Sequence, residues 1–187
     1  PNQNVLHDYA SAGGRVFASH FHYPWFNAGP YATENLATWT TGANSIAAIS
    51  AVVASGFPDA IAMGQWLTNV GALSSGALPI DNARHNADVS AANVHSNVWL
   101  SAPSTSTSPN ATELFSFDTP TNAALSDAGV AETCGRVVYT ELHVAIATGD
   151  NVTLPVPTGC SVVDLSPQEK ALEYMLFDLS ACTPVLP

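Results

Sequence analysis

The spacing of apolar residues along the chain changes between helical and strand periods, and it predicts a mixed α/β domain. Residues 4–12 place Leu6, Tyr9 and Ala10 on one helical face, and a Gly-Gly pair then stops the helix and turns the chain. The segment RVFAS at 15–19 lacks polar alternation, which is typical of a strand covered on both faces. The chain is therefore expected to begin with a helix, a glycine turn and a buried parallel strand.

Two further helices are predicted from their ends and their apolar stripes. Asp59 can cap the first and Gly71 can end it. Its stripe recurs at i, i+3, i+4 and i+7 and consists of Met63, Trp66, Leu67 and Val70. The second has Ser166 as its N-cap, Pro167 at the first helical position and Glu169 completing a capping box. Its stripe consists of Leu172, Met175, Leu176 and Leu179.

Strand patterns and loop-rich stretches complete the picture of a single domain over residues 1–187. ELFSFDT at 113–119 alternates well enough for a half-exposed strand, and GRVVYTELHVAI at 135–146 is the strongest strand pattern in the chain. Residues 27–58 and 72–112 are rich in turn-forming residues, and we interpret them as loop-rich excursions or insertions with short strands.

Composition narrows the class of partner and the location. The chain has 187 residues, of which 47% are apolar and 10% charged, and its formal charge is −11, which disfavours nucleic acid and anionic lipid surfaces. The longest apolar candidate for a membrane helix, 46–57, falls well short of about 20 residues. Few lysines, much Ser, Thr and Asn, and formal glycosylation sequons at Asn110 and Asn151 favour a secreted, extracellular protein.

The three cysteines form an odd set, so that one sulfur is left without an internal partner. Cys160 and Cys182 flank the last predicted helix and are the preferred disulfide pair. Closing a loop of that length stabilises a fold by about 3 kcal/mol on the chain-entropy model. Cys134 is then free or bonded outside the chain.

Two segments, DYASAGGRVFASH and CGRVVYTELHV, together resemble the trehalose-utilisation-like family of the class I glutamine-amidotransferase-like superfamily. The resemblance implies a flavodoxin-like parallel sheet with helices on both faces. It also implies that strands precede the first helix, so that this chain is a partial domain lacking its first strands. We therefore expect either a preceding N-terminal fragment or chain to complete the sheet, with Cys134 bonded to it, or strands from the loop-rich middle to substitute.

Candidate catalytic residues lie where two predicted parallel strands end, because ligands bind beyond the carboxyl ends of such strands. Ser19 and His20 end one strand, and Glu141 and His143 end the other. The resemblance places a nucleophilic Cys and a partner His at these positions, but Ser19 and His20 occupy the elbow here, so hydrolysis of glutamine by a thiolate is not expected. Ser19 activated by His143 is one alternative.

A metal site is the second alternative and a structural role is the third. His20 and His22, two apart in a strand, would share a face, and His143 with one further ligand would complete a site for a divalent metal such as zinc. Candidates for that ligand are His85, Asp81 and Glu141. In the third alternative His22 packs in an aromatic cluster with its nitrogens bonded to the backbone.

The aromatic residues Tyr23, Trp25 and Trp39 follow the predicted site. They form either a small core beneath a long loop or a platform on which a neutral carbohydrate stacks. Glu141 paired with another carboxylate would suit a glycosidase. We expect a carbohydrate-related role, in binding or hydrolysis, without a required cofactor. The alternative is a non-catalytic structural or interaction domain of a larger surface protein.

Overall fold

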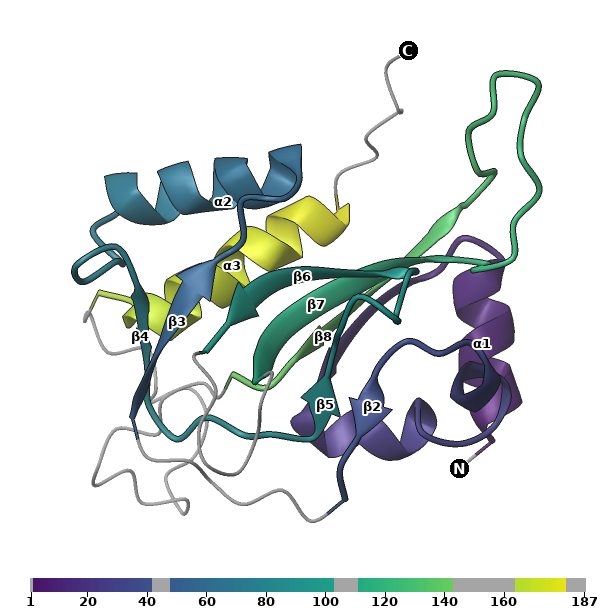
Figure 1. Ribbon diagram of the computed structural model, residues 1–187, viewed down its shortest axis with the longest axis horizontal. Coiled ribbons are helices and arrows are strands. Elements are labelled where there is room, and N and C mark those ends of the chain that lie inside the picture. Colours follow the sequence, from purple (N-terminus) through teal and green to yellow (C-terminus); the bar gives the residue numbers. More distant parts are fainter. Residues whose placement is uncertain (1, 42–47, 103–110, 143–163, 181–187) are drawn as a thin grey trace.

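The computed structural model describes residues 2–41, 48–102, 111–142 and 164–180, and shows a mixed α/β fold built on a curled six-stranded sheet (Figure 1). The strand order is β1-β8-β7-β6-β3-β4. The strands are β1 (Arg15–Ser19), β3 (Ile49–Val53), β4 (Leu78–Ile80), β6 (Ser96–Ser101), β7 (Thr112–Thr119) and β8 (Gly135–Thr140). Within these described strands only β1 and β8 pair in parallel, and the other neighbours are antiparallel. The expected parallel sheet is therefore present at one edge only.

Different elements cover the two faces of the sheet (Figure 1). Helices α2 (Pro58–Asn69) and α3 (Pro167–Ser180) lie together on one face. The other face carries α1 (Gln3–Ser11), the 3₁₀ helices η1 (His20–Trp25) and η2 (Pro30–Thr33), and a small antiparallel ribbon. That ribbon pairs β2 (Thr38–Trp39) with β5 (Ala87–Asp88).

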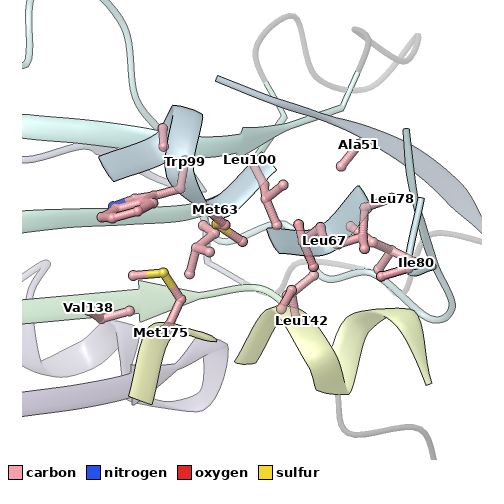
Figure 2. Packing of buried hydrophobic residues seen from close by; sticks show 14 of the residues in the cluster. Ala51, Met63, Leu67, Leu78, Ile80, Trp99, Leu100, Val138, Leu142 and Met175 are labelled. Carbon is pink, nitrogen blue, oxygen red and sulfur yellow. The ribbon is translucent and has the colours of Figure 1, made fainter. Parts of the chain in front are cut away.

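The first hydrophobic core fills the space between α2, α3 and the sheet (Figure 2). Met63 of α2 and Met175 of α3 meet Leu100 and Val138 of the sheet, all without exposed surface. Trp99 is buried in the same core, and its indole N–H donates to Ser116 Oγ at 2.8 Å. A register irregularity in β6 between Val98 and Leu100 lets Trp99 and Leu100 both serve this core, because a bulge re-aims side chains that would otherwise alternate.

The second core lies on the opposite face and is mainly aromatic. Phe115 and Phe117 of β7 alternate with residues of the first core, as strand geometry requires. Phe26 directly follows η1 and Tyr31 lies in η2. Both pack over Phe115 and Phe117, and the ring centroids of Phe26 and Tyr31 are 5.4 Å apart. The loop that follows β1 is thus anchored by aromatic packing rather than left as a free excursion.

Helix α1 approaches β8 closely at Gly135. A Cβ atom there would clash with the carbonyl oxygen of Ala10 and lie 2.7 Å from Cγ2 of Thr119. The predicted glycine turn after α1 is confirmed, and Gly13 has φ +101, a backbone conformation that favours glycine. The sequence pattern therefore positioned both α1 and β1 correctly.

The predicted start of α3 is also confirmed. Ser166 N–H donates to Glu169 Oε2 at 2.7 Å and Glu169 N–H donates to Ser166 Oγ at 3.4 Å, which is the reciprocal capping box. Met175 and Leu179 are buried as expected, but Leu176 is 54% exposed. Its assignment to the buried stripe was wrong, because the helix presents only one narrow side to the sheet.

Three other expectations are corrected by the structure and a fourth is refined. Helix α2 starts at Pro58 with Phe57 as N-cap, so that Asp59 lies inside the first turn and is not the cap. Strand β7 was expected to be half exposed, yet every residue except Asp118 is buried, because both faces are covered. Strand β1 is an edge strand and is mostly half-buried rather than enclosed. The loop-rich regions supply strands of the main sheet, which agrees with the expected alternative that strands from the middle of the chain contribute: β3 lies within 27–58, and β4 and β6 lie within 72–112.

None of the helices in the described part of the chain has the length and apolarity needed to cross a lipid bilayer.

Candidate functional site

The ends of β1 and β8 lie side by side, as the sequence predicted. Ser19 is the register partner of Thr140 in the parallel pair, so His20 and Glu141 each follow directly after neighbouring strand ends. The Tyr139 hydroxyl donates to the carbonyl oxygen of His20 at 3.4 Å and links the two strands at this end. Of the four predicted catalytic residues, the structure therefore brings Ser19, His20 and Glu141 to one region. His143 lies outside the described residues.

Ser19 is paired with His22. Its backbone N–H donates to His22 Nδ1 at 3.1 Å, and its Oγ lies 3.1 Å from the same nitrogen. A ring nitrogen that accepts a backbone N–H carries no proton, so the proton of a neutral His22 is assigned to Nε2. The contact caps the start of η1, and it makes His22 the described imidazole that could accept the Ser19 proton.

The expectation that His20 and His22 share one strand face is wrong. Both lie in η1, where successive residues are turned by about 120°. His20 is 5% exposed and its ring contacts that of Phe21 at 4.0 Å, whereas His22 is exposed. The described residues contain no group of three or more His, Cys, Asp or Glu side chains placed to hold a metal ion. A zinc site that includes His143 stays a prediction.

The most unusual feature of this region is a pair of buried carboxyl groups. Glu141 N–H donates to the carbonyl oxygen of Glu113 at 2.9 Å, which continues the antiparallel β7–β8 ladder by one residue. The next pair along the ladder on the same face is Phe115 with Tyr139, in the second core. Glu113 and Glu141 therefore extend an aromatic row and face the same layer.

Neither carboxyl group has exposed surface. Glu141 Oε1 accepts the Asn86 N–H at 2.7 Å, but within the described residues no hydrogen-bond partner is found for Glu141 Oε2 or for either carboxyl oxygen of Glu113. Burial, followed by the nearby charges of Glu141 and Asp88, raises the pKa of Glu113 to about 9. Burial also raises the pKa of Glu141 to about 8, against the lowering effects of the backbone N–H groups of Asn86 and Ala87 and of the Tyr139 hydroxyl. Both groups are therefore protonated at neutral pH.

A third acidic residue, Asp88, borders the pair of glutamates. Asp88, at the end of β5, raises the pKa of both glutamates by its charge, and its Oδ1 lies 2.9 Å from His85 Nε2. His85 was expected to be an ordinary loop histidine or an additional metal ligand. The structure places it beside Asp88, so the pair of glutamates has a His–Asp contact as its neighbour.

Sequence reasoning missed Glu113. The signal was present, because Phe115 and Phe117 point into the second core and a period of two carries the same face back to position 113. A carboxylate on the apolar side of a strand is rare without a partner. Reading ELFSFDT as half exposed placed this side chain in solvent and hid the signal.

The aromatic residues predicted to bind a ligand lie against the second core. Tyr23, Trp25 and Trp39 are each partly buried, and Trp39 contacts the ring of Tyr139 at 5.2 Å. Packing beneath the loop, one of the two alternatives, is thus what the structure contains. Their role in carbohydrate binding stays a prediction.

Two other histidines lie away from this region. His7 is on α1, and its Nε2 lies 2.9 Å from Glu34 Oε1, while its ring contacts Tyr31. His95 lines a polar surface hollow together with Glu34 and Asn35. These contacts of His7 and His95 do not involve Glu113 or Glu141.

Comparisons of the chain with protein-family models, with curated proteins and with solved structures gave no match. The resemblance to the trehalose-utilisation-like family therefore stays a prediction. The proposed Cys160–Cys182 disulfide lies outside the described residues. Cys134 is exposed and forms no disulfide within the described part of the chain.

Proposed function

We propose that the protein hydrolyses a neutral glycoside, with Glu113 and Glu141 as the catalytic pair. The observation that carries the proposal is the placement of these two fully buried, incompletely paired carboxyl groups opposite each other at the end of β8. A carboxyl group whose pKa lies near or above neutrality keeps its proton and can donate it to a leaving group. Buried carboxyl groups with raised pKa values are concentrated at functional sites, because their burial is costly.

The spacing of the pair favours one reaction class. Side chains of directly opposed residues in an antiparallel pair have Cβ atoms about 5 Å apart. Opposed positions allow the two carboxyl groups to reach the separation of about 5 Å that suits the retaining mechanism. In that mechanism one protonated group gives its proton to the leaving oxygen, the other attacks the anomeric carbon as a carboxylate, and water then hydrolyses the glycosyl-enzyme. The pair is thus a candidate for hydrolysis with retention of configuration at the anomeric carbon.

The two environments favour different roles. Glu141 accepts the Asn86 N–H, which stabilises its ionised form, so it is the better nucleophile once it has lost its proton, and activity is expected to rise as the pH rises toward about 8. Glu113 has no such donor and the higher pKa, about 9, so it is the better acid. Because the two groups interact, their apparent pKa values belong to the pair, and the first proton to leave is assigned to Glu141.

A neutral substrate fits the charge of this region. The chain carries 15 acidic residues against four basic ones, and Asp88 adds a charge beside the pair, so an anionic substrate would be repelled. Trp39, which packs on Tyr139 next to Glu141, offers an aromatic ring for stacking on a sugar. Since neither carboxyl group has exposed surface, the proposal requires residues around the pair to move when substrate enters.

The expected location and the finer fold belong to the same proposal. A secreted protein with a carbohydrate substrate is consistent with the lysine-poor composition and the two sequons. A flavodoxin-like origin of the sheet is supported by the parallel pairing of β1 with β8 after a helix and a glycine turn. Support for that origin is confined to this edge, because the remaining pairs are antiparallel.

The test is hydrolysis of a panel of α- and β-linked p-nitrophenyl glycosides by the wild-type protein and by Glu113→Gln and Glu141→Gln. We expect each variant to lower kcat/KM by about 10²-fold or more, since both roles in the mechanism are needed. Glu132→Gln, at an exposed position, is the matched control and is expected to retain activity. Product analysis by NMR is expected to show retention.

Two results would contradict the proposal. One is the absence of hydrolysis above the buffer rate over the whole panel. The other is hydrolysis that survives Glu113→Gln and Glu141→Gln unchanged, which would place the chemistry elsewhere. Circular dichroism of each variant establishes that a loss of activity is not a loss of fold.

A further inference from the structure

The two ends of the described sheet are protected to very different degrees. Strand β4, at one end, is three residues long and has Pro79 at its centre, and such short, proline-bearing strands resist pairing with other chains. Strand β1, at the other end, has five residues in unbroken register with β8 and contains no proline. Its only charged residue, Arg15, is at its start. One edge is thus closed to further pairing and the other is open among the described residues.

A hollow of about 330 Å³ runs along β1. Its lining residues come from α1, β1 and η1, and are Leu6, Val16, Phe17, Ala18, His22, Trp25 and Phe26. Val16 and Ala18 belong to one pleated face of β1, and Phe17 belongs to the other. A hollow lined by both faces of one strand lies along the edge of that strand. The hollow thus adjoins the outer edge of β1, where a further strand of the sheet would lie, mainly on the face that carries the second core.

Apolar side chains lie on both sides of the outer edge of β1. On one side, Leu6 of α1 and Trp25 of η1 line the hollow. On the other, α3 contacts β1, and Tyr174 of α3 packs on Trp66 of α2. Leu176 lies two residues, or about 200°, further round α3, and it is 54% exposed on the side directed away from α2. A strand added beside β1 would be covered on both faces.

We propose that the outer edge of β1 receives an extended apolar strand from another polypeptide, which completes the sheet. A strand covered on both faces reads as a continuous apolar run, so the occupant is expected to be a strand of at least five residues with apolar side chains at three or more successive positions. The excess of acidic residues, 15 against four, favours an occupant that is neutral or basic. Backbone hydrogen bonds supply the register and the apolar layers supply the affinity.

A second copy of this chain fits the edge less well. Leu6 of α1 and Trp25 of η1 line the hollow beside β1, so a second copy would have to place its own α1 and η1 next to those of the first when the strand edges reach the 4.8 Å spacing of paired strands. Two chains of charge −11 also repel each other. The inference is independent of the proposed glycosidase activity, because the edge of β1 and the carboxyl pair share no residue.

The test uses a fluorescent synthetic peptide with the sequence of residues 135–140, GRVVYT. This sequence already pairs with the inner edge of β1, contains consecutive apolar residues and carries one positive charge. We expect it to raise fluorescence anisotropy on binding and to slow amide hydrogen exchange in residues 15–19. The same peptide N-methylated at alternate residues cannot form strand hydrogen bonds, and it is expected not to bind.

Two substitutions on α1 locate the binding. Leu6→Asp places a carboxylate in the hollow and is expected to weaken peptide binding by at least tenfold. Val5→Asp, on the same helix at a position 61% exposed and outside the hollow lining, is the matched control and is expected to leave binding unchanged. Melting temperatures of both variants establish that the fold persists.

Three results would overturn the proposal. They are an absence of added protection in residues 15–19, equal binding by the Leu6→Asp and Val5→Asp variants, and a dimer of the protein alone in sedimentation equilibrium with β1 already protected. The last result would assign the edge to a second copy. None of these measurements depends on catalysis, so failure here is distinguishable from failure of the proposed hydrolase.

Discussion

The stability of this protein is expected to fall as the pH rises through neutrality, and the buried pair Glu113 and Glu141 is expected to cause the fall. Both groups are neutral in the folded protein below about pH 8, because burial raises their pKa values to about 9 and about 8 from 4.5. In the unfolded chain they ionise near pH 4.5. The perturbation that isolates them is the double substitution Glu113→Gln and Glu141→Gln, which keeps the shape of the neutral acids and the acceptor for Asn86 N–H.

The sign and size follow from proton linkage. A carboxyl group with a raised pKa binds its proton more tightly when folded, so its contribution to stability is complete below about pH 4.5 and is lost as the pH rises through the folded-state pKa. Between these limits each group lowers the free energy of unfolding by about 1.4 kcal/mol per pH unit. One group alone gives about 2.7 kcal/mol between pH 5.5 and 7.5. That is a large share of the 5–15 kcal/mol typical of a folded domain.

The assay is urea unfolding of the wild type and the double variant at pH 5.5, 6.5 and 7.5. We expect the wild-type free energy of unfolding to decline with pH more steeply than that of the variant, by at least about 1.4 kcal/mol per unit. Glu132→Gln is the control, since Glu132 is exposed and should leave the wild-type slope unchanged. Equal slopes for the wild type and the double variant would refute the conclusion that these carboxyl groups are protonated in the fold.

Three further substitutions test the packing that positions the site. Gly135→Ala drives a methyl group into the carbonyl oxygen of Ala10, and we expect a loss of about 1–3 kcal/mol in chemical unfolding; an unchanged midpoint would disprove the close approach of α1 to β8. Arg136→Met removes hydrogen bonds at 2.8 and 3.1 Å to carboxylates and leaves Asp178, with an 11% exposed side chain, unpaired. We expect it to cost about 1–3 kcal/mol, and a smaller cost in 1 M salt would show that the charge pairing matters. Ser166→Ala removes half of the capping box of α3 and is expected to cost about 1 kcal/mol, measured as a lower melting temperature; no change would mean that the cap contributes nothing.

Local signals in the sequence were sufficient to recognise the helices and to identify β1 and β8 as strands. The glycine turn after α1 and the capping box of α3 are formed by residues close in the chain, so they could be recognised without the fold. β1 and β8 were recognisable as apolar runs. The expectation that these two strands are parallel neighbours is confirmed by their register, and the resemblance that suggested it stays a prediction.

The rest of the sheet could not be predicted because its strands depend on partners far away in the chain. β3 follows a segment rich in turn-forming residues, and it is a strand because β6 and β4 pair with it on either side. β7 reads as half exposed, but the layer of η1, η2 and the β2–β5 ribbon covers its second face. Burial of the second face of β7 results from packing against distant parts of the chain, and this packing outweighs the weak local strand preference of the sequence.

The direction of β7 explains why half of the candidate site was found and half was missed. In an all-parallel sheet the functional side chains follow the carboxyl ends of the strands, and this rule selected Ser19, His20 and Glu141. β7 runs opposite to β8, so its beginning, not its end, meets the carboxyl ends of β1 and β8, and it delivers Glu113 to that place. The carboxyl pair therefore exists because the sheet changes from parallel to antiparallel between β1–β8 and β8–β7. A fully parallel arrangement of the same strands would carry Glu113 to the far end of the sheet, about 20 Å away for strands of six residues, and no pair would form.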